Sequence, residues 1–458
     1  MKKNDTVRVE ITDLNNLGFG VGHVEGKTLF VAGAVDGETV LARVLTVKPT
    51  YAVGKVEKLL VASPHRAEPV CPVRGCGGCA YASVSYGHEL ALKEGYVRAA
   101  FHKVGIEADV RPVACALNGD GTPRALRYRN KSQYPVAAAP DGGYRIGFYA
   151  PKSHRVVEAA CCPLQPACFE GIVATLRELF ARFGISAYDE ETGEGLVRHI
   201  YLRRGEVSGQ VLLTLVLNGA RLPHSEEIVH ALRGAHPELV GILVNENTAR
   251  TNVICGDKWH LLWGQDYLED TLGGVRLRIH PAAFYQVNHA AAELLYAKAK
   301  ELACLTGREQ VLDLYCGCGS IGLSMADAAG EVIGIEIEPS AVRMAQENAR
   351  LNGIGNARFW CGDASSAERL LGDAALEMGL HPDVVVLDPP RKGTTQELMN
   401  YLAGLAVPRI VYISCNPDTL ARDVSYFLSL GYEMSAVYPF DLFPRTGHVE
   451  SVVCLTHK

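Results

Sequence analysis

A cysteine follows directly on an apolar run near the C-terminus. The run IVYI at residues 410–413 is typical of a buried parallel strand, and Pro417 with Asp418 predicts that a helix begins soon after it. Cys415 is therefore expected at the carboxyl end of a strand and beside a helix N-terminus. Ligands of open α/β sheets bind at this edge, and a helix N-terminus lowers the pKa of a thiol. The pattern predicts a reactive thiol; the alternative is an ordinary small buried residue.

A histidine and a glutamate near the C-terminus are candidates for a general base. The segment FPRTGHVE, residues 443–450, precedes the strand-like SVVCLT and sets His448 and Glu450 two residues apart, on one face of an extended chain. Because Glu450 enters an apolar strand, desolvation is expected to raise its pKa toward the working range of a base. The alternative is a surface carboxylate on an edge strand.

Acidic residues end several strands of the C-terminal half. From about residue 279, strand patterns alternate with helix patterns, and five such strands predict a doubly wound parallel sheet. The turn after the first strand carries Gly317 and Gly319, too few glycines for a dinucleotide fingerprint. Glu336 at the second strand end suits two ribose hydroxyls, and Asp363 at the third suits an adenine amine. Together with Asp388 at the fourth, these residues predict an S-adenosylmethionine site.

The fourth strand ends in Asp388-Pro-Pro-Arg391, whose two prolines fix a rigid turn. Proteins that methylate exocyclic nitrogens often have an aromatic residue where Arg391 stands, so nitrogen methylation is disfavoured. A thiol at the next strand end favours carbon methylation instead. The C5 atom of a pyrimidine is a poor nucleophile until a thiolate has added to C6, and Cys415 could supply that thiolate.

Three cysteines lie close together after a proline-containing linker at residues 64–72. Cys71, Cys76 and Cys79 have the spacing C-x4-C-x2-C in a glycine-rich loop that could wrap an iron–sulfur cluster. Zinc is the alternative, but zinc loops usually bring a second CxxC pair, and the sequence shows none. For the fourth ligand we prefer Cys162, because it precedes a proline as Cys71 does. The other candidates for this position are Cys115, Cys161 and Cys168.

The elements before the sheet suggest contact with RNA. Residues 6–60 alternate short strand patterns with glycine-rich turns, which predicts an antiparallel barrel of roughly five strands. Between residues 124 and 131, basic residues surround Tyr128 without an acid, a pattern that suits phosphate contacts with base stacking. Residues 145–255 alternate strand and helix patterns typical of an α+β domain.

The composition limits the possible classes. The chain has 458 residues, of which 48% are hydrophobic and 21% charged, as in a globular protein of several domains. Its net charge of -6 means that a nucleic acid must be held by local basic patches. No apolar run reaches the roughly eighteen residues of a membrane span, and no apolar segment follows the N-terminal lysines. The 14 cysteines then predict thiols and metal ligands in a cytoplasmic protein, not a disulfide framework.

Five motifs, taken together and in this order, resemble those of the uracil-C5 RNA methyltransferases. They are Phe284-Tyr-Gln286-Val-Asn288, Asp313-Leu-Tyr-Cys-Gly-Cys-Gly319, Asp388-Pro-Pro-Arg391, Ser414-Cys-Asn-Pro417 and His448-Val-Glu450. The N-terminal barrel resembles a TRAM domain, an OB-like barrel of RNA-modifying enzymes, through GFGVG, VAGAVDGE and GKVEKLL. A barrel together with a cluster loop resembles the ribosomal-RNA branch, since the transfer-RNA branch generally lacks both.

The resemblance implies roles for single residues. Cys415 would be the nucleophile at C6 of uracil and Glu450 the base at C5, with Phe284 near the flipped base. The positions that match cofactor and substrate contacts are Gln286, Tyr315, Glu336 and Asp388, together with Ser320, where some members have asparagine, and Asp363, where the residue varies. The implied 4Fe-4S ligands are Cys71, Cys76, Cys79 and Cys162, in a loop one residue shorter than the C-x5-C-x2-C of some members.

We therefore expect an α/β protein with three domains. An OB-like TRAM barrel would span residues 1–62, a central α+β domain with the iron–sulfur loop residues 63–278, and a Rossmann-like S-adenosylmethionine-dependent methyltransferase domain residues 279–458. The expected function is methylation of C5 of a uridine in 23S ribosomal RNA by a cytoplasmic monomer. The alternatives are the T-loop uridine of transfer RNA and a non-catalytic RNA-binding protein with a redox-sensing cluster. Cytosine-C5 methylation of DNA is disfavoured, because its nucleophile usually follows a proline.

Overall fold

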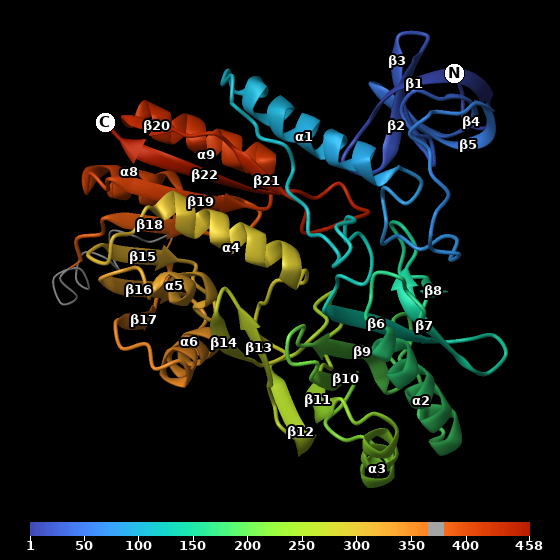
Figure 1. Ribbon diagram of the computed structural model, residues 1–458. Helices are drawn as coiled ribbons and strands as arrows, with labels where there is room; N and C mark the ends of the chain where they lie inside the picture. The colour runs from blue at the N-terminus through green and yellow to red at the C-terminus, as the bar shows by residue number, and fades with distance from the viewer. Residues whose placement is uncertain (365–379) are drawn as a thin grey trace.

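The computed structural model describes residues 1–364 and 380–458. Five N-terminal strands close into a barrel in the order β1-β2-β3-β5-β4 (Figure 1). They are β1 (Thr6–Leu14), β2 (Phe19–Val24), β3 (Lys27–Ala32), β4 (Thr39–Val47) and β5 (Tyr51–Val61). The barrel was expected to be antiparallel, but β3 and β5 pair in parallel. A closed ring with an odd number of strands cannot alternate direction throughout, so one parallel pair is required.

The central part of the chain forms a seven-stranded sheet in the order β12-β11-β10-β9-β6-β7-β8. Its strands are β6 (Lys131–Ala138), β7 (Tyr144–Tyr149), β8 (Val156–Glu158), β9 (Val197–Arg204), β10 (Val211–Leu217), β11 (Leu239–Glu246) and β12 (Lys258–Gly264). Two helices, α2 (Ala167–Phe183) and α3 (Ser225–Ala235), bury their apolar stripes against one face. Leu212 and Leu243 on the other face join the core of the C-terminal half. The sheet is therefore covered on both faces.

The C-terminal half is built on an eight-stranded sheet in the order β17-β16-β15-β18-β19-β22-β20, with β21 paired to β22. Its strands are β15 (Gln310–Leu314), β16 (Glu331–Glu336), β17 (Ala357–Cys361), β18 (Val384–Leu387), β19 (Arg409–Ser414), β20 (Tyr432–Met434), β21 (Tyr438–Phe440) and β22 (Glu450–His457). The five strands predicted from the sequence are parallel to one another, and β22 runs antiparallel to β19. The hairpin of β13 (Leu268–Leu272) and β14 (Val275–Ile279) precedes this sheet.

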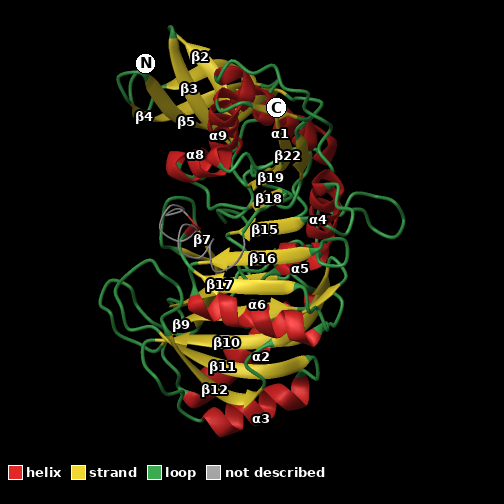
Figure 2. Cartoon of the chain, turned by 90° about the vertical axis from the view of Figure 1, so that its left-hand side faces the viewer, coloured by secondary structure: helices red, strands yellow, loops and turns green. Residues whose placement is uncertain are grey.

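Helices cover both faces of the C-terminal sheet (Figures 1 and 2). On one face lie α4 (His289–Ala303), α5 (Ser320–Met325) and α6 (Pro339–Leu351). On the other lie α8 (Gln396–Gly404), α9 (Pro417–Ser429) and also α1 (Tyr86–Lys103). Helix α1 comes from the segment assigned to the central domain by sequence, yet its Val97 and Phe101 pack in the core of the C-terminal half. Among the described residues, no helix is long and apolar enough to cross a bilayer.

Candidate active site

Cys415, Glu450 and Asp388 come together at one edge of the C-terminal sheet. Strand β19 ends at Ser414, which pairs with Ser451 in antiparallel register. Cys415 and Glu450 are the next residues outward, so they are cross-strand neighbours. Asp388 directly follows the adjacent strand β18. Glu450 is buried, and β22 lies between β19 and β20, so the alternative of an exposed carboxylate on an edge strand is wrong.

The surroundings raise the pKa of all three groups. Burial, helped by the negative charge of Asp388 and opposed by the guanidinium of Arg391, raises the pKa of Glu450 to about 8. Burial also raises the pKa of Asp388 to about 7. Burial together with the two carboxylates raises the pKa of the Cys415 thiol to about 11. Our expectation that the N-terminus of α9 lowers this pKa is therefore wrong, because desolvation and two nearby acids outweigh the helix. The thiol keeps its proton until a neighbouring base removes it.

His448 lies two residues before β22 begins and is more exposed than Glu450. Burial and the charge of Arg391 lower the pKa of His448. The same guanidinium also acts on Glu450 and on Cys415, so it lies near all three side chains. The expected grouping of His448 with Glu450 stays a prediction.

The turn after β15 forms the neighbouring part of the site. The backbone N–H of Gly317 donates to Glu336 Oε2 at 3.0 Å, so the end of β16 is fixed against this turn. The N–H of Glu338 donates to the other oxygen, Oε1, at 3.0 Å. Tyr315 has a left-handed backbone (φ 65°), and its hydroxyl lies 3.2 Å from Thr394 Oγ1. Burial raises the pKa of Tyr315 and the charge of Asp363 adds to the shift, which places Asp363 nearby. The predicted residues Tyr315, Glu336 and Asp363 are thus gathered at this turn.

Buried polar groups hold the start of α5. The N–H of Gly322 donates to Asp313 Oδ2 at 2.9 Å, and burial raises the pKa of Asp313 to about 7. The hydroxyl of Ser320 lies 2.7 Å from that of Tyr296 on α4. Ser320 therefore has a structural partner in addition to its position at the turn. Sequence reasoning missed Tyr296, because a tyrosine within an apolar helix carries no sign of such a contact.

The loop before α4 carries Phe284 and Gln286. Phe284 is 67% exposed, so its ring is accessible for stacking, whereas Gln286 is buried. Asn130 Nδ2 donates to the backbone oxygen of Gln286 at 2.8 Å, and Arg203 Nη2 donates to that of Ala283 at 2.9 Å. Both holding residues come from the central domain. No local pattern points to Arg203, because in the sequence it is one basic residue within a strand.

The basic segment at residues 124–131 differs from the expectation. Tyr128 is only 1% exposed, and its hydroxyl donates to the backbone oxygen of Pro444 at 2.9 Å, so it cannot stack on a base. Arg124 pairs with Glu206 at 2.7 Å, and Arg127 donates to the backbone oxygen of Gln165. The predicted stacking is wrong because Tyr128 is used to attach this segment to the loop that leads to Glu450.

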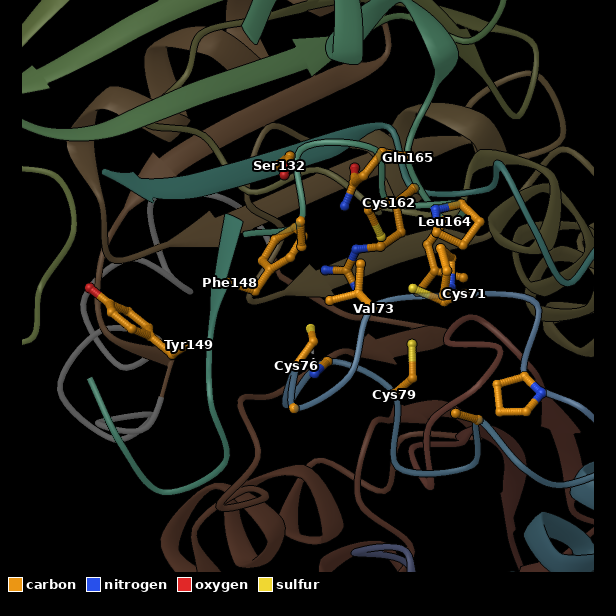
Figure 3. Close-up of a pocket in the computed structure, with 18 of the residues that line it drawn as sticks. Cys71, Val73, Cys76, Cys79, Ser132, Phe148, Tyr149, Cys162, Leu164 and Gln165 are labelled. Carbon is orange, nitrogen blue, oxygen red and sulfur yellow. Dashed lines mark hydrogen bonds between the residues drawn. The ribbon is translucent and has the colours of Figure 1, made fainter. Parts of the chain in front are cut away.

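The cysteine loop faces a cavity of about 770 Å³ against the central sheet (Figure 3). Figure 3 shows the sulfur atoms of Cys71, Cys76, Cys79 and Cys162 directed toward the same space. Burial, with the charges of the other three thiols, raises the pKa of Cys79 to about 12. The described residues that line this cavity do not include Cys115, Cys161 or Cys168.

The residue types around this cavity fit an iron–sulfur cluster. Four thiols and a glycine-rich loop are present, and the N–H of Gly78 donates to Cys76 Sγ at 3.4 Å. Within residues 1–364 and 380–458, no group of three or more His, Cys, Asp or Glu side chains is arranged to hold a metal ion. The thiols thus line a shared space without meeting at one point. A cluster with several irons needs its ligands farther apart than a single ion does.

The amino-acid sequence is similar to those of known RNA methyltransferases. The sequence profile described as tRNA (Uracil-5-)-methyltransferase matches residues 243–458, and that of the TRAM domain matches residues 2–56. A relative from Halalkalibacterium halodurans, described as an uncharacterized RNA methyltransferase, is 40% identical, with 100% of this chain and 98% of the relative covered. A relative from Clostridium tetani with the same description is 38% identical, with 100% and 97% covered.

A solved structure is also similar over nearly the whole chain. It is the Pyrococcus abyssi tRNA (uracil-54, C5)-methyltransferase in complex with S-adenosyl-L-homocysteine. The two chains are 27% identical with a TM-score of 0.79, and the similarity covers 98% of this chain and 99% of that one. It therefore includes the barrel, the central sheet and the C-terminal sheet.

Proposed function

This chain belongs to the S-adenosylmethionine-dependent RNA (uracil-C5) methyltransferase family, and we propose that its substrate is a uridine of 23S ribosomal RNA, which it methylates at C5. The observation that carries the proposed chemistry is the pairing of Cys415 with Glu450 across two strands, beside Asp388. Addition of a thiolate to uracil C6 and removal of a proton from C5 require a nucleophile and a base on neighbouring atoms of one ring. The cross-strand pair supports both roles.

We assign the cofactor to the turn after β15. Tyr315, Ser320, Glu336 and Asp363 surround this turn. The charge of Asp388 acts on Asp313 before the turn, and Cys318 of the turn contacts the backbone of the loop that carries Gln286. Bound S-adenosylmethionine would supply the methyl group and a positively charged sulfonium. Glu336, already held by two backbone N–H groups, is oriented to accept ribose hydroxyls. The exposed Phe284 is suited to stack on a uridine that has left its helix.

The proposed reaction passes through a covalent bond between Cys415 and uracil C6. Cys415 gives its proton to the carboxylate of Asp388, and its sulfur then adds to C6 of uracil. The C5 atom attacks the methyl group, and S-adenosylhomocysteine leaves. Ionised Glu450 then removes the C5 proton, the C5–C6 double bond forms again, and the bond from C6 to sulfur breaks. The freed thiolate takes its proton back from Asp388. The pKa of about 8 makes Glu450 a stronger base than an ordinary glutamate.

The cysteine cavity and the domain division complete the proposal. We propose that Cys71, Cys76, Cys79 and Cys162 hold a 4Fe-4S cluster with a structural role, since methyl transfer needs no electron. We also propose three domains, at residues 1–62, 63–278 and 279–458, and a monomer that works in the cytoplasm. The barrel would contribute to RNA binding.

A second candidate substrate is the T-loop uridine of transfer RNA. It is favoured by the Pyrococcus abyssi enzyme, whose name gives uracil-54 of tRNA and whose chain matches this one nearly end to end. We expected the barrel and cluster loop to favour ribosomal RNA, but similarity over 98% of the chain means that architecture does not separate the two substrates. Contacts at the RNA-facing surface must decide between them.

The deciding experiment uses both RNAs. Ribosomal and transfer RNA from an unmodified source would be incubated with the protein and methyl-labelled S-adenosylmethionine, and the product mapped. Label at C5 of a 23S uridine is the expected result. Label confined to the T-loop would support the second candidate, and no label in either RNA would contradict the proposed activity.

Two variants test the assigned roles. Cys415→Ala is expected to lose methylation by at least about four orders of magnitude, since a covalent step then has no nucleophile. Glu450→Gln is expected to transfer the methyl group to the uridine but to keep the RNA bound as a covalent adduct, which survives a denaturing gel. Absence of any adduct with Glu450→Gln would count against Glu450 as the base.

A further inference from the structure

A fully buried group of charges lies behind the loop that leads to Glu450. Lys93 on α1 donates from Nζ to Glu89 Oε1 at 2.8 Å and to Asp441 Oδ1 at 2.7 Å, and all three side chains are completely buried. Tyr86 donates its hydroxyl proton to Asp441 Oδ2 at 2.7 Å. None of these groups faces the proposed reaction. Their burial needs another explanation, because ions are costly to remove from water and apolar residues would fill the space as stably.

Asp441 is the first residue of the loop at 441–449, and Glu450 directly follows its last residue. Strand β21 ends at Phe440, which pairs with Glu450 in antiparallel register. Asp441 therefore begins the loop immediately after the strand partner of the proposed base. Contacts that hold Asp441 therefore also hold the pairing of Phe440 with Glu450.

The same charges hold the middle of the loop. Lys93 Nζ also donates to the backbone oxygen of Phe443 at 3.2 Å, and the N–H of Arg445 donates to Glu89 Oε1 at 2.7 Å. Arg445 has a left-handed backbone (φ 71°), a conformation that costs free energy unless it is fixed by contacts. Lys93 thus connects α1 to three points of the loop, at 441, 443 and, through Glu89, at 445. The position of Glu450 depends on a helix whose own residues lie outside the active site.

We propose that Lys93 is a positioning residue that, with Glu89 and Asp441, holds the 441–449 loop so that Glu450 reaches the C5 proton. The inference rests on the proposed role of Glu450 as base. Loss of Lys93 removes its hydrogen bonds to Asp441 and to the Phe443 backbone. Among the described residues, Asp441 then keeps only the Tyr86 hydroxyl as a side-chain partner, and Glu89 keeps only the Arg445 guanidinium, at 3.8 Å, as a nearby cation. A base displaced by about 1 Å loses on the order of 100-fold in rate. The affected step is proton removal, which follows adduct formation.

The test follows the adduct in single turnovers with the RNA identified above. Wild type and Lys93→Met are mixed with RNA and S-adenosylmethionine, and formation and decay of the adduct are followed on denaturing gels. We expect Lys93→Met to slow decay about 10- to 100-fold while formation slows much less, so that adduct accumulates. A merely structural role would reduce active protein and would leave the decay rate of the remaining adduct unchanged.

The matched control is Val97→Ala. Val97 is also fully buried on α1, but it packs in the apolar core of the sheet and makes none of the contacts of the Lys93 charge group. It should lower the free energy of unfolding without slowing adduct decay. If Lys93→Met does not fold, the triple variant Glu89→Gln, Lys93→Met, Asp441→Asn removes all three charges together and should show the same slow decay.

The outcomes separate the inference from the function on which it rests. Glu450→Gln is run in the same assay. Persistent adduct with Glu450→Gln and normal decay with Lys93→Met, or with the triple variant, would overturn the positioning role alone. If Glu450→Gln forms no adduct, the assignment of the base and the positioning role both fail. Slow decay with Lys93→Met and normal decay with Val97→Ala is the expected result.

Discussion

Glu450 and Asp388 lie close enough for the charge of one to affect the acidity of the other. Both carry a pKa near neutral, about 8 and about 7, because burial penalises their ionised forms and Asp388 adds repulsion at Glu450. Arg391 opposes these effects at both Glu450 and Cys415. A cationic cofactor in the neighbouring site would also favour the ionised carboxylates. These surroundings favour the protonated form of the proposed base, Glu450, until a cation binds nearby.

The raised pKa of Glu450 predicts a particular dependence of stability on pH. Between its ordinary value of 4.5 and about 8, the folded protein holds a proton that the unfolded chain has released. Stability contributed by this group therefore falls as the pH rises through that window. Glu450→Gln lacks this effect, so its free energy of unfolding should rise relative to wild type by up to roughly 1.4 kcal/mol per pH unit.

Urea titrations of both proteins at several pH values between 5 and 8.5 would measure this difference. Glu433→Gln is the control, since Glu433 is an exposed carboxylate on β20 of the same sheet. A difference between Glu450→Gln and wild type that stays constant with pH would contradict the raised pKa.

At the scale of elements, the turn between β15 and α5 determines the cofactor site. Gly319 has φ 79°, and a Cβ there would lie 2.9 Å from the ring of Phe359 and 3.0 Å from the Cβ of Ala345. The turn is thus pressed against β17 and α6, where only glycine fits. This contact brings the Gly317 N–H to Glu336 and closes the site.

Gly319→Ala should therefore weaken binding of S-adenosylhomocysteine by at least tenfold, measured by calorimetry. Two effects disfavour the folded turn in this variant. The left-handed backbone costs about 1–2 kcal/mol for a residue with a side chain, and the close contact with Phe359 adds a further cost. Gly353→Ala is the matched control, because Gly353 also has a positive φ of 65° but has open space around it. It should lose stability and keep its affinity. Equal losses of affinity in the two variants would show that strain alone is responsible.

At the scale of the whole molecule, two connections tie the N-terminal segments to the rest. Helix α1 packs on α9 and fixes the loop before Glu450, as described for Lys93. The cysteine loop lies against β6, β7 and the segment at 159–165, so a cluster there would join the linker to the central sheet. That sheet in turn holds the loop of Phe284 and Gln286 through Asn130.

Anaerobically purified protein is therefore expected to be brown and to contain about four irons per chain. Cys162→Ser should lose most of this iron, because Cys162 lines the cavity with the three loop cysteines. Cys161→Ser, at the adjacent exposed cysteine, is the matched control and should keep it. Iron and zinc contents would be measured together. Zinc in place of iron, or equal iron loss in both variants, would contradict the proposed cluster.

The sequence by itself determined the family, the five parallel strands and the order of the strand ends at which Glu336, Asp363, Asp388 and Cys415 lie. These features follow from local patterns, since apolar runs, turn glycines and motif order are written along the chain. Only the tertiary structure decided which groups meet. It buried Tyr128 against Pro444 and raised the thiol pKa that a helix N-terminus was expected to lower. It also revealed Lys93 and Arg203, whose partners lie 348 residues away at Asp441 and 80 residues away at Ala283. Burial and charge environment arise from such distant contacts, and no local pattern encodes them.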